Sequence, residues 1–416
     1  METERQNEVT EYVKKKQECC GCGLCYEKCP KKAIEMTKDE YGFIYPAIDR
    51  SKCIECGICK KVCAFKDEAL NTVKTCYAAV NCNKQRLQKS ASGGMFSAIA
   101  ESFLKNGGIV CGAQMTFSKG KAHVEHVTID SIRDLEKLQG SKYVQSDIKN
   151  VFEKILDQLK QGKRVLFSGT PCQVTALKAC VGKKYAENLY TLDIICHGVP
   201  NIQFFNDYIE NNFTRNNIFL QKFTFRDKKY GWGVKGSLSG ENYKREKVTE
   251  KMDPDTSSYY RYFLKGEIYR ESCYHCPFAQ ENRAGDLTLG DYWGVERFDP
   301  ELLEENGGPF KEQEGVSCLM VNNAKGETLL KEDGQGILKR KILLENVKVI
   351  NTQLKTPAVH TGLRNKILKT YVQKGYGKVE HIFIRQRLVE KAIKMVKDMV
   401  KKVLPKSVVD KIKKSK

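Results

Sequence analysis

The chain has 416 residues, and its 71 Lys and Arg outnumber its 51 Asp and Glu, for a formal charge of +20. The first residues, METERQNEVTEYVKKKQ, lack the apolar segment of a signal peptide, and no apolar run approaches the roughly 18 residues of a membrane span. The 18 cysteines argue against a secreted disulfide framework, because they cluster at metal-ligand spacing. We therefore expect a cytoplasmic metalloprotein of two or three domains.

Two copies of one cysteine motif lie within the first 65 residues. The first is C-x2-C-x2-C-x3-C followed by Pro, and the second repeats that spacing 34 residues later. In such runs three thiolates bind one 4Fe–4S cluster, and the fourth reaches the neighbouring cluster. The spacing predicts one cluster on Cys19, Cys22, Cys25 and Cys63, and a second on Cys53, Cys56, Cys59 and Cys29. The alternative is a pair of zinc sites, which usually show two CxxC pairs divided by a longer loop.

Glycines beside these ligands permit the tight backbone that clusters require: Gly21, Gly23 and Gly57. Residues 33–49 predict a β-hairpin around a Lys-Asp-Glu turn, and Cys20 is a spare thiol next to the ligands. We expect an α+β ferredoxin-like dicluster domain over residues 1–65, followed by a polar linker over residues 66–75.

Residues 76–330 alternate short β-branched runs with helical ones. The pattern predicts strands within residues 77–80, 108–115, 164–171 and 188–198, and helices within residues 91–108 and 146–162. This alternation predicts an α/β domain with parallel strands. We expect its chemistry in the loops that follow the strands, which hold SGTPC and CHG.

Four cysteines of this domain stand apart by their settings: Cys172, Cys196, Cys273 and Cys276. The first two directly follow predicted strands, and the last two form a CxxC pair. The residues alone leave two interpretations open. Either all four share a metal, or two buried strand-end thiols lie apart from a redox or zinc pair.

Six motifs in order resemble the coenzyme F-420 hydrogenase/dehydrogenase beta-subunit family: ASGGMFSAIA, GSKYVQS, VLFSGTPCQVTALK, DIICHGVP, FRDKKYGWG, and SCYHCPF with RAGDLTLGDYWG. The likeness is greatest to the bacterial branch with an N-terminal dicluster ferredoxin. It implies an α/β flavin-binding domain with bound FAD and a third 4Fe–4S cluster on Cys172, Cys196, Cys273 and Cys276. The cysteines left as free thiols are Cys20, Cys76, Cys82, Cys111, Cys180 and Cys318.

The resemblance also directs attention to polar residues near the strand ends. We expect FAD to contact Ser92, Gly93, Gly94, Ser141, Lys142, Gly169 and Thr170. Amides at a helix N-terminus favour a diphosphate, although a plain helix cap also explains Ser-Gly-Gly. The catalytic candidates are Lys142, as a cation near the flavin ring, and His197, as a proton shuttle. The alternatives are that Lys142 is a surface lysine and that His197 is hydrogen-bonded to the backbone.

Two further polar groups suit an anionic or flat substrate, and a solvated loop explains them nearly as well. The first holds Arg226, Lys228, Lys229, Tyr230 and Trp232, and the second holds Arg283, Asp286, Asp291 and Trp293. His275, between two cysteines, is expected to point away from the cluster.

Residues 331–416 are expected to form a C-terminal extension that ends in a basic amphipathic helix. Apolar residues recur at three- and four-residue steps from Leu388 to Val403, opposite a lysine-rich side, and Pro405 ends or kinks the helix. Such a helix suits an anionic membrane surface, and packing on the body or on a partner is the alternative.

The positive charge needs no nucleic-acid partner. Each cluster site with four thiolates carries about −2, and FAD about −2 more. Residues 378–416 alone hold 13 Lys and Arg against 4 Asp and Glu. A cluster-stabilised nucleic-acid-binding protein is the alternative of a different class.

We expect a flavin-dependent iron–sulfur oxidoreductase. It would relay electrons from ferredoxin-type clusters through a third cluster to FAD, and on to an unknown small molecule by hydride transfer. Its partner would be a ferredoxin or another oxidoreductase subunit. We expect the protein to lie in the cytoplasm, and at the inner face of the membrane if the basic helix binds there. The alternative is a non-catalytic electron-transfer subunit of a larger complex.

Overall fold

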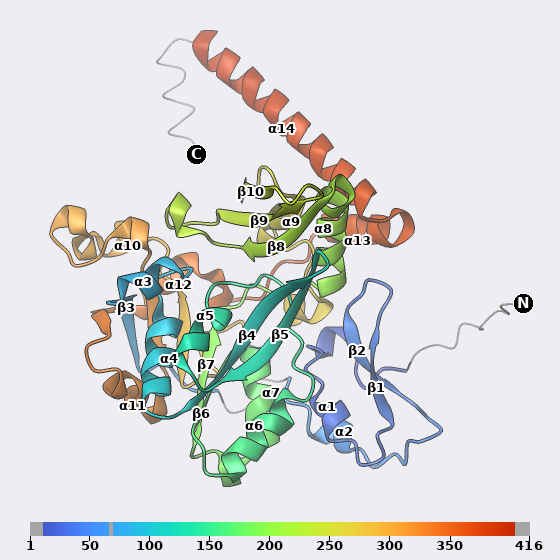
Figure 1. Ribbon diagram of the computed structural model, residues 1–416, viewed down its shortest axis with the longest axis vertical. Helices are drawn as coiled ribbons and strands as arrows, with labels where there is room; N and C mark the ends of the chain where they lie inside the picture. The colour runs from blue at the N-terminus through green and yellow to red at the C-terminus, as the bar shows by residue number, and fades with distance from the viewer. Residues whose placement is uncertain (1–10, 66–69, 404–416) are drawn as a thin grey trace, which may run out of the picture.

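The N-terminal module is a small hairpin flanked by two short helices (Figure 1). The computed structural model describes residues 11–65 and 70–403. The elements of the module are α1 (Leu24–Glu27), β1 (Ile34–Lys38), β2 (Ile44–Ile48) and α2 (Ile58–Lys61). The two strands pair antiparallel, which confirms the predicted hairpin. Each helix lies inside one cysteine motif and begins after a left-handed glycine, Gly23 or Gly57.

The body is built on a mixed sheet. Its strands are β3 (Thr75–Asn81), β4 (Ile109–Ser118), β5 (Lys121–Ile129), β6 (Val165–Gly169), β7 (Leu189–Ile194), β11 (Leu287–Asp291), β12 (Ser317–Val321) and β13 (Ile337–Ile342). Within the described residues their order is β13-β3-β12-β11-β7-β6-β4-β5. The central strands β4, β6, β7 and β11 are parallel, and the pairs outside them are antiparallel. Because β13 belongs to this sheet, the body continues past the predicted boundary at residue 330.

Helices cover both faces of the sheet. The helices of the body are α3 (Lys84–Gln88), α4 (Met95–Lys105), α5 (Leu135–Leu138), α6 (Val151–Lys160), α7 (Pro171–Val181), α10 (Val295–Phe298), α11 (Ala324–Glu332) and α12 (Leu344–Ile350). Val110, Leu166 and Leu192 pack against α4 and α11, whereas Cys111 and Phe167 pack against α6 and α7. Burial on both faces explains why the parallel strands are continuously apolar.

The linker is partly fastened to this body. Residues 66–69 of the predicted segment lie outside the described residues. Asn71 exchanges backbone hydrogen bonds with Arg283, both at 2.8 Å, and its side chain donates to the carbonyl oxygen of Gly285 at 3.1 Å. Residues 70–75 of the predicted linker are therefore attached to the body by hydrogen bonds.

A second, smaller sheet lies above the main one. Its strands β8 (Ile218–Thr224), β9 (Gly236–Asn242) and β10 (Lys247–Met252) are antiparallel. They pack with α8 (Ile202–Asn212), α9 (Ser258–Leu264) and α13 (Gly362–Lys374) around an aromatic core. Phe43 and Tyr45 of the ferredoxin module belong to the same core, so module and body are packed as one unit.

The last helix, α14 (Tyr376–Val403), projects from the body (Figure 1). Its first turns are anchored, because Tyr376, Val379 and Phe383 are buried. Residues 391–399 are exposed around the whole circumference. Pro405, the predicted end of the helix, lies outside the described residues. Among those described, no helix is both long and apolar enough to cross a bilayer.

Candidate functional site

A cavity of about 470 Å³ opens at the carboxyl ends of the parallel strands. Gly169 and Thr170 reach it from β6, Cys196 and His197 from β7, and Asp291 from β11. Its size lies within the range of small-molecule and cofactor sites. The expectation that the chemistry sits after these strands agrees with this position.

One group of four cysteines lines this cavity, and we call it the cavity group: Cys172, Cys196, Cys273 and Cys276. Burial, together with the three other thiols, raises the pKa of Cys196. Burial, together with the thiols of Cys172 and Cys273, raises the pKa of Cys276 to about 12. Thiols that interact this strongly lie close together around one space, and four thiolates are the donor set of a 4Fe–4S cluster.

Cys172 is presented by the first turn of α7. Thr170 caps this helix together with Gln173, and its Oγ1 lies 3.1 Å from Cys172 Sγ. A hydrogen bond from Cys20, and then one from Thr170, lower the pKa of Cys172 to about 7. The thiolate, which is the form that binds metal, is therefore favoured here.

Arg283 holds the loops that carry two other members of the cavity group. It is 2% exposed, and its Nη1 donates to the carbonyl oxygens of Phe278 and Gln280, at 3.3 and 3.1 Å. These carbonyls lie two and four residues after Cys276. Nη2 donates to the carbonyl oxygen of Ile194 at 3.1 Å, two residues before Cys196. Arg283 thus holds these loops in place, and it also lines the main cavity.

The ferredoxin cysteines lie in two groups. The inner group is Cys19, Cys22, Cys25 and Cys63, and burial and the other three thiols raise the pKa of Cys25. The outer group, Cys29, Cys53, Cys56 and Cys59, lines a separate cavity of about 330 Å³. Among residues 11–65 and 70–403, no three His, Cys, Asp or Glu side chains converge as ligands of a single metal ion.

The inner group faces the body and the outer group faces solvent. Cys20 is buried and hydrogen-bonds to both Cys22 and Cys172, so the inner and cavity groups adjoin. The matching residue of the second repeat, Ile54, is 58% exposed, and Cys56 is exposed as well. The three groups therefore follow one another from the surface to the main cavity.

Most of the predicted flavin contacts line the main cavity: Ser92, Gly94, Ser141, Lys142, Gly169 and Thr170. Gly93 does not. A Cβ there would lie 2.2 Å from the carbonyl oxygen of Ala79 and 2.7 Å from the amide of Ser317, so Gly93 permits close packing of the loop on β3 and β12.

Lys142 points its amine at neutral acceptors. Nζ donates to the carbonyl oxygens of Leu138 and Gln139, at 2.9 and 2.8 Å. Removal from water lowers its pKa to about 7. Such an amine, lining a cavity without a carboxylate partner among the described residues, is prepared to bind an anion.

His197 also lines the cavity, and its ring is open to that space. Protein atoms surround it otherwise, and this desolvation lowers its pKa, while Asp291 acts in the opposite direction. The imidazole is therefore neutral at pH 7 and able to take up a proton. His275 is exposed and does not line the cavity, as expected.

Comparison with known proteins places these features in a family. Residues 76–153 match the family described as coenzyme F420 hydrogenase/dehydrogenase, beta subunit N-terminus, and residues 162–341 match its C-terminal counterpart. The two matches together span more than half of the chain. The chain belongs to the coenzyme F420 hydrogenase/dehydrogenase beta-subunit family.

Residues 18–66 of this family member also match a 4Fe–4S dicluster domain, which makes it an iron–sulfur protein of the electron-transfer type. An uncharacterized ferredoxin of Methanocaldococcus jannaschii is 36% identical over 77 residues, 18% of this chain and 99% of that ferredoxin. Among solved structures, the F420-reducing NiFe hydrogenase complex of Methanosarcina barkeri holds a similar chain. It has 17% identity and a TM-score of 0.43, covering 76% of this chain and 94% of that one.

Two loops of this family member meet at the cavity wall. Arg226 pairs with Asp291 through two bonds, at 2.5 and 2.9 Å, and Trp232 donates to the same carboxylate at 2.8 Å. The rings of Trp232 and Trp293 stack at 4.6 Å. Arg226, Asp291 and Trp293 line the cavity, so the predicted substrate loop does reach it.

Lys228 is instead a buried anchor. It donates to the carbonyl oxygens of Leu87 and Ser92, at 2.8 and 2.6 Å, and so fixes the loop before α4. Desolvation lowers its pKa to about 7. Lys229 is exposed, and neither it nor Tyr230 lines the cavity.

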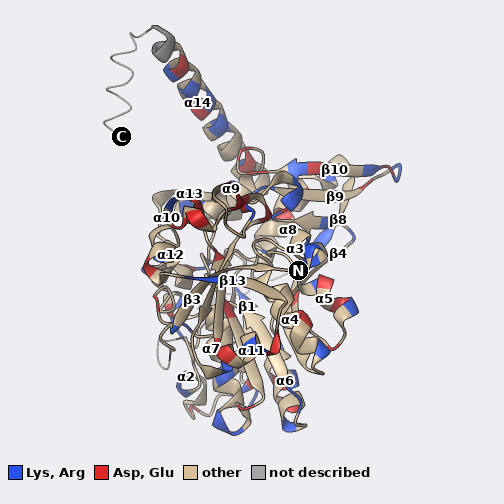
Figure 2. Ribbon diagram, turned by 90° about the vertical axis from the view of Figure 1, so that its left-hand side faces the viewer, with Lys and Arg blue, Asp and Glu red and all other residues tan. Residues whose placement is uncertain are grey.

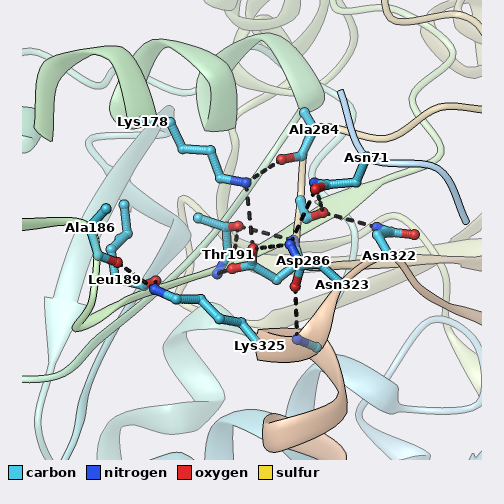
Figure 3. A network of polar contacts seen from close by, with 12 residues as sticks. Asn71, Lys178, Ala186, Leu189, Thr191, Ala284, Asp286, Asn322, Asn323 and Lys325 are labelled. Atoms are coloured by element: carbon cyan, nitrogen blue, oxygen red, sulfur yellow. Dashed lines mark hydrogen bonds and ion pairs between the residues drawn. The ribbon is translucent and has the colours of Figure 1, made fainter. Parts of the chain in front are cut away.

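Asp286 lies in a polar network away from the cavity (Figure 3). Its Oδ2 accepts from the amide and hydroxyl of Thr191, both at 2.7 Å, and Oδ1 accepts from Asn323 at 2.8 Å. Lys178 lies 3.5 Å from Oδ1. These contacts join β7, α7 and α11, so Asp286 stabilises the fold and does not reach a substrate in the cavity.

Sequence reasoning missed three residues at the cavity: His126, Gln145 and Arg270. His126 donates Nε2–H to the carbonyl oxygen of Ser168 at 3.0 Å, and burial lowers its pKa to about 4. Gln145 lies in the GSKYVQS motif but was not singled out there, and His126 and Arg270 lie outside the quoted motifs. The one available signal was an arginine three residues before Cys273.

Proposed function

We propose that this family member is an iron–sulfur flavoprotein oxidoreductase that accepts electrons from a redox partner and reduces a small molecule at its main cavity. Three 4Fe–4S clusters would supply one-electron transfer, and FAD would couple it to two-electron hydride chemistry. The family itself is one of hydrogenase and dehydrogenase subunits, and an oxidoreductase role is in keeping with it.

The observation that carries this proposal is the succession of the three cysteine groups. The outer group is partly exposed, the inner group is buried against the body, and the cavity group lines the main cavity. Each group offers four thiols, which is the donor set that a 4Fe–4S cluster needs. A chain of three such groups that ends at a cavity serves electron delivery, whereas structural metal sites have no need of that order.

The main cavity fits a dinucleotide flavin in three respects. Gly94, in the left-handed conformation, starts α4, and no side chain among the described residues caps this helix. Its first amides adjoin the cavity through Met95 and Phe96, where a diphosphate would be favoured. Ile194 and Leu264, 38% and 40% exposed, turn apolar surface to the same space, which suits a flat ring.

Lys142 and His197 would then have different roles. The amine of Lys142 has neutral acceptors only, so an anionic group in the cavity would raise its protonation and be stabilised by it. The neutral imidazole of His197 can take up a proton and pass it to a bound molecule. Both assignments depend on the position of the ligand in the cavity.

The outer group marks the docking face for an electron carrier. Around it lie four exposed lysines, Lys31, Lys32, Lys60 and Lys61, and none of them pairs with a carboxylate in the described part of the chain. The nearby acidic side chains of Glu11 and Glu55 are both paired with Arg50. Exposed Ile54 adds an apolar contact. This surface suits a small carrier protein with an acidic face, such as a ferredoxin.

The projecting part of α14 is a second contact surface (Figure 2). Its apolar side chains are exposed by about half or more: Leu388, Val389, Ile393, Met395, Val396 and Met399. Lysines occupy the other side. A helix end without packing partners is only marginally stable in water. An anionic membrane surface would cover the apolar side and attract the lysines.

The family description as a beta subunit favours one other candidate, an electron-transfer subunit that serves a partner enzyme. A variant with Cys172 replaced by Ser separates the steps within one chain. We expect it to keep about eight iron, bind flavin and accept electrons, but to reduce the flavin far more slowly than the wild type. Flavin reduction at the wild-type rate would contradict the proposed order of the groups.

A further inference from the structure

Arg270 is a buried cation at the boundary between the ferredoxin module and the body. It is 1% exposed and is among the largest fully buried side chains. Nη2 donates to the carbonyl oxygen of Ile44 at 2.8 Å, and Nε donates to Gln145 Oε1 at 3.0 Å. Nη1 donates to the carbonyl oxygen of Cys19 at 3.4 Å. All these acceptors are neutral, and no carboxylate pairs with Arg270 in the described part of the chain.

A buried charge without a counter-charge is unfavourable unless its surroundings compensate for it. The ring of Tyr45, whose centroid lies 4.5 Å from Cζ, contributes a cation–π contact. Neighbouring Arg364, by contrast, is paired with Glu271 at 2.9 Å. The charge of Arg270 is thus left for a negative group other than a carboxylate of the described residues.

The module is shaped to receive this guanidinium. A Cβ on Gly21 would lie 2.7 Å from Arg270 Nη2 and 2.7 Å from the carbonyl oxygen of Ile44. In the second repeat the same position is Glu55, which takes the same left-handed conformation with φ of 54°. The turn therefore tolerates a side chain, and the glycine in the first repeat is needed for contact with Arg270.

Arg270 lies between the inner and cavity groups. Its guanidinium bonds to the backbone of Cys19, and its own carbonyl oxygen accepts from the amide of Cys273 at 3.0 Å. It lines the main cavity together with Cys22 and Cys172. The outer group, which lines the other cavity, is not in contact with it.

We propose that Arg270 is the counter-charge for the inner and cavity groups, and that its fixed positive charge makes both of them easier to reduce than the outer group. A site with four thiolates becomes more negative by one charge when it gains an electron, and a nearby buried cation favours that state. Arg270 thereby biases electrons from the docking face toward the main cavity. This inference rests on the proposed function, because it requires clusters at both groups.

The test is a dye-mediated redox titration of the full-length, anaerobically purified protein, followed by electron paramagnetic resonance. Arg270→Gln removes the charge and keeps a hydrogen-bond donor. At a fixed potential we expect the reduced-to-oxidised ratio of the clusters in the inner group and in the cavity group to fall about tenfold or more. This change is equivalent to about 59 mV for one electron. The reduced-to-oxidised ratio of the outer group should be unchanged in Arg270→Gln. Arg270→Lys should keep the wild-type ratios of all three groups.

A second variant covers the case in which Arg270→Gln loses its clusters. Gln145→Glu leaves the guanidinium in place and sets a carboxylate where Nε now donates at 3.0 Å, so it should lower the same two ratios. Unchanged ratios in Gln145→Glu, or an equal change at the outer site, would overturn the role of Arg270. An iron count well below twelve in the wild type would instead overturn the proposed function, so the two failures are distinguishable.

Discussion

The thiol of Cys20, in the ferredoxin module, hydrogen-bonds to the thiol of Cys172, in the α/β body. This contact lies at the boundary between the two units, where the inner group and the cavity group adjoin. It also gives a spare cysteine, next to the ligands in the sequence, a defined place in the structure.

Replacing Cys20 by Ala should leave the metal content intact. Cys20 contacts two ligand groups but completes neither, because each has four other thiols. We expect about twelve iron per chain in Cys20→Ala, with a loss of stability of about 1 kcal/mol from the small cavity. Cys22→Ala, the matched control, should lose about four iron. Equal losses of iron in both variants would make Cys20 a ligand and would contradict the grouping.

Gly21→Ala should separate the ferredoxin module from the body. Its Cβ would meet Arg270 and Ile44 at 2.7 Å, in addition to the strain of a φ of +69°. Gly23→Ala is the control, because it shares the strain, with φ of +76°, and meets nothing within 4 Å. We expect Gly23→Ala to cost about 1 kcal/mol and Gly21→Ala clearly more. Limited proteolysis near residue 70 would report the separation, and equal cleavage of both variants would refute it.

Stability should fall in mild acid because of His126. Burial lowers its pKa to about 4, below the ordinary value of 6.5, so the folded protein holds it neutral. Below pH 6.5 the unfolded chain takes up a proton that the folded chain does not, and stability is lost as the pH falls from 6.5 toward 4. We expect roughly 2 kcal/mol of loss by pH 5 from this group.

His126→Gln keeps a donor for the carbonyl oxygen of Ser168 and does not titrate. Its urea midpoint should therefore fall less than that of the wild type between pH 8 and pH 5, measured without oxygen. Parallel pH dependence in the two proteins would show that His126 is not the titrating group.

Reversing charge at the docking face should slow electron delivery from an acidic carrier. The variant Lys31→Glu/Lys60→Glu/Lys61→Glu should take electrons from a ferredoxin at least tenfold more slowly at low salt, and the difference should shrink as salt rises. Reduction by the small reagent dithionite should stay the same. Lys121→Glu/Lys163→Glu/Lys222→Glu, three exposed lysines of the body that do not line the cavity of the outer group, is the control. If the triple variant takes electrons from the ferredoxin at the wild-type rate, the carrier docks on another surface.

The projecting part of α14 should bind anionic vesicles. Leu388→Ser/Met395→Ser/Met399→Ser removes apolar contacts and keeps every lysine, so co-sedimentation with vesicles of phosphatidylcholine and phosphatidylglycerol should weaken at least tenfold. Vesicles of phosphatidylcholine alone should bind neither protein well. The wild type could instead form concentration-dependent dimers and fail to bind vesicles. If the triple variant also abolished those dimers, the surface would be assigned to a second copy of the chain.

The sequence predicts much of this arrangement, because the decisive signals are local. The two cysteine motifs fix their own cluster groups, and the apolar runs before Cys172 and Cys196 are the parallel strands that bring those residues to one sheet edge. The second sheet was missed, since β9 (GSLSGEN) and β10 (KVTEKM) are rich in polar residues, and the sheet is held by aromatic packing from α8 and α9 that no local pattern records. Arg270 and Gln145 were missed for the same reason. Their partners, Cys19 and Ile44, are more than 100 residues away, and only the docked module shows why a buried cation sits there.

The most direct test of the account is a count of iron, acid-labile sulfide and flavin on one sample purified without oxygen. The account predicts about twelve iron, about twelve sulfide and one flavin per chain, from three cysteine groups and the main cavity. About eight iron and eight sulfide without flavin would contradict it. In that case the ferredoxin module alone would carry metal, and Cys172, Cys196, Cys273 and Cys276 would have another purpose.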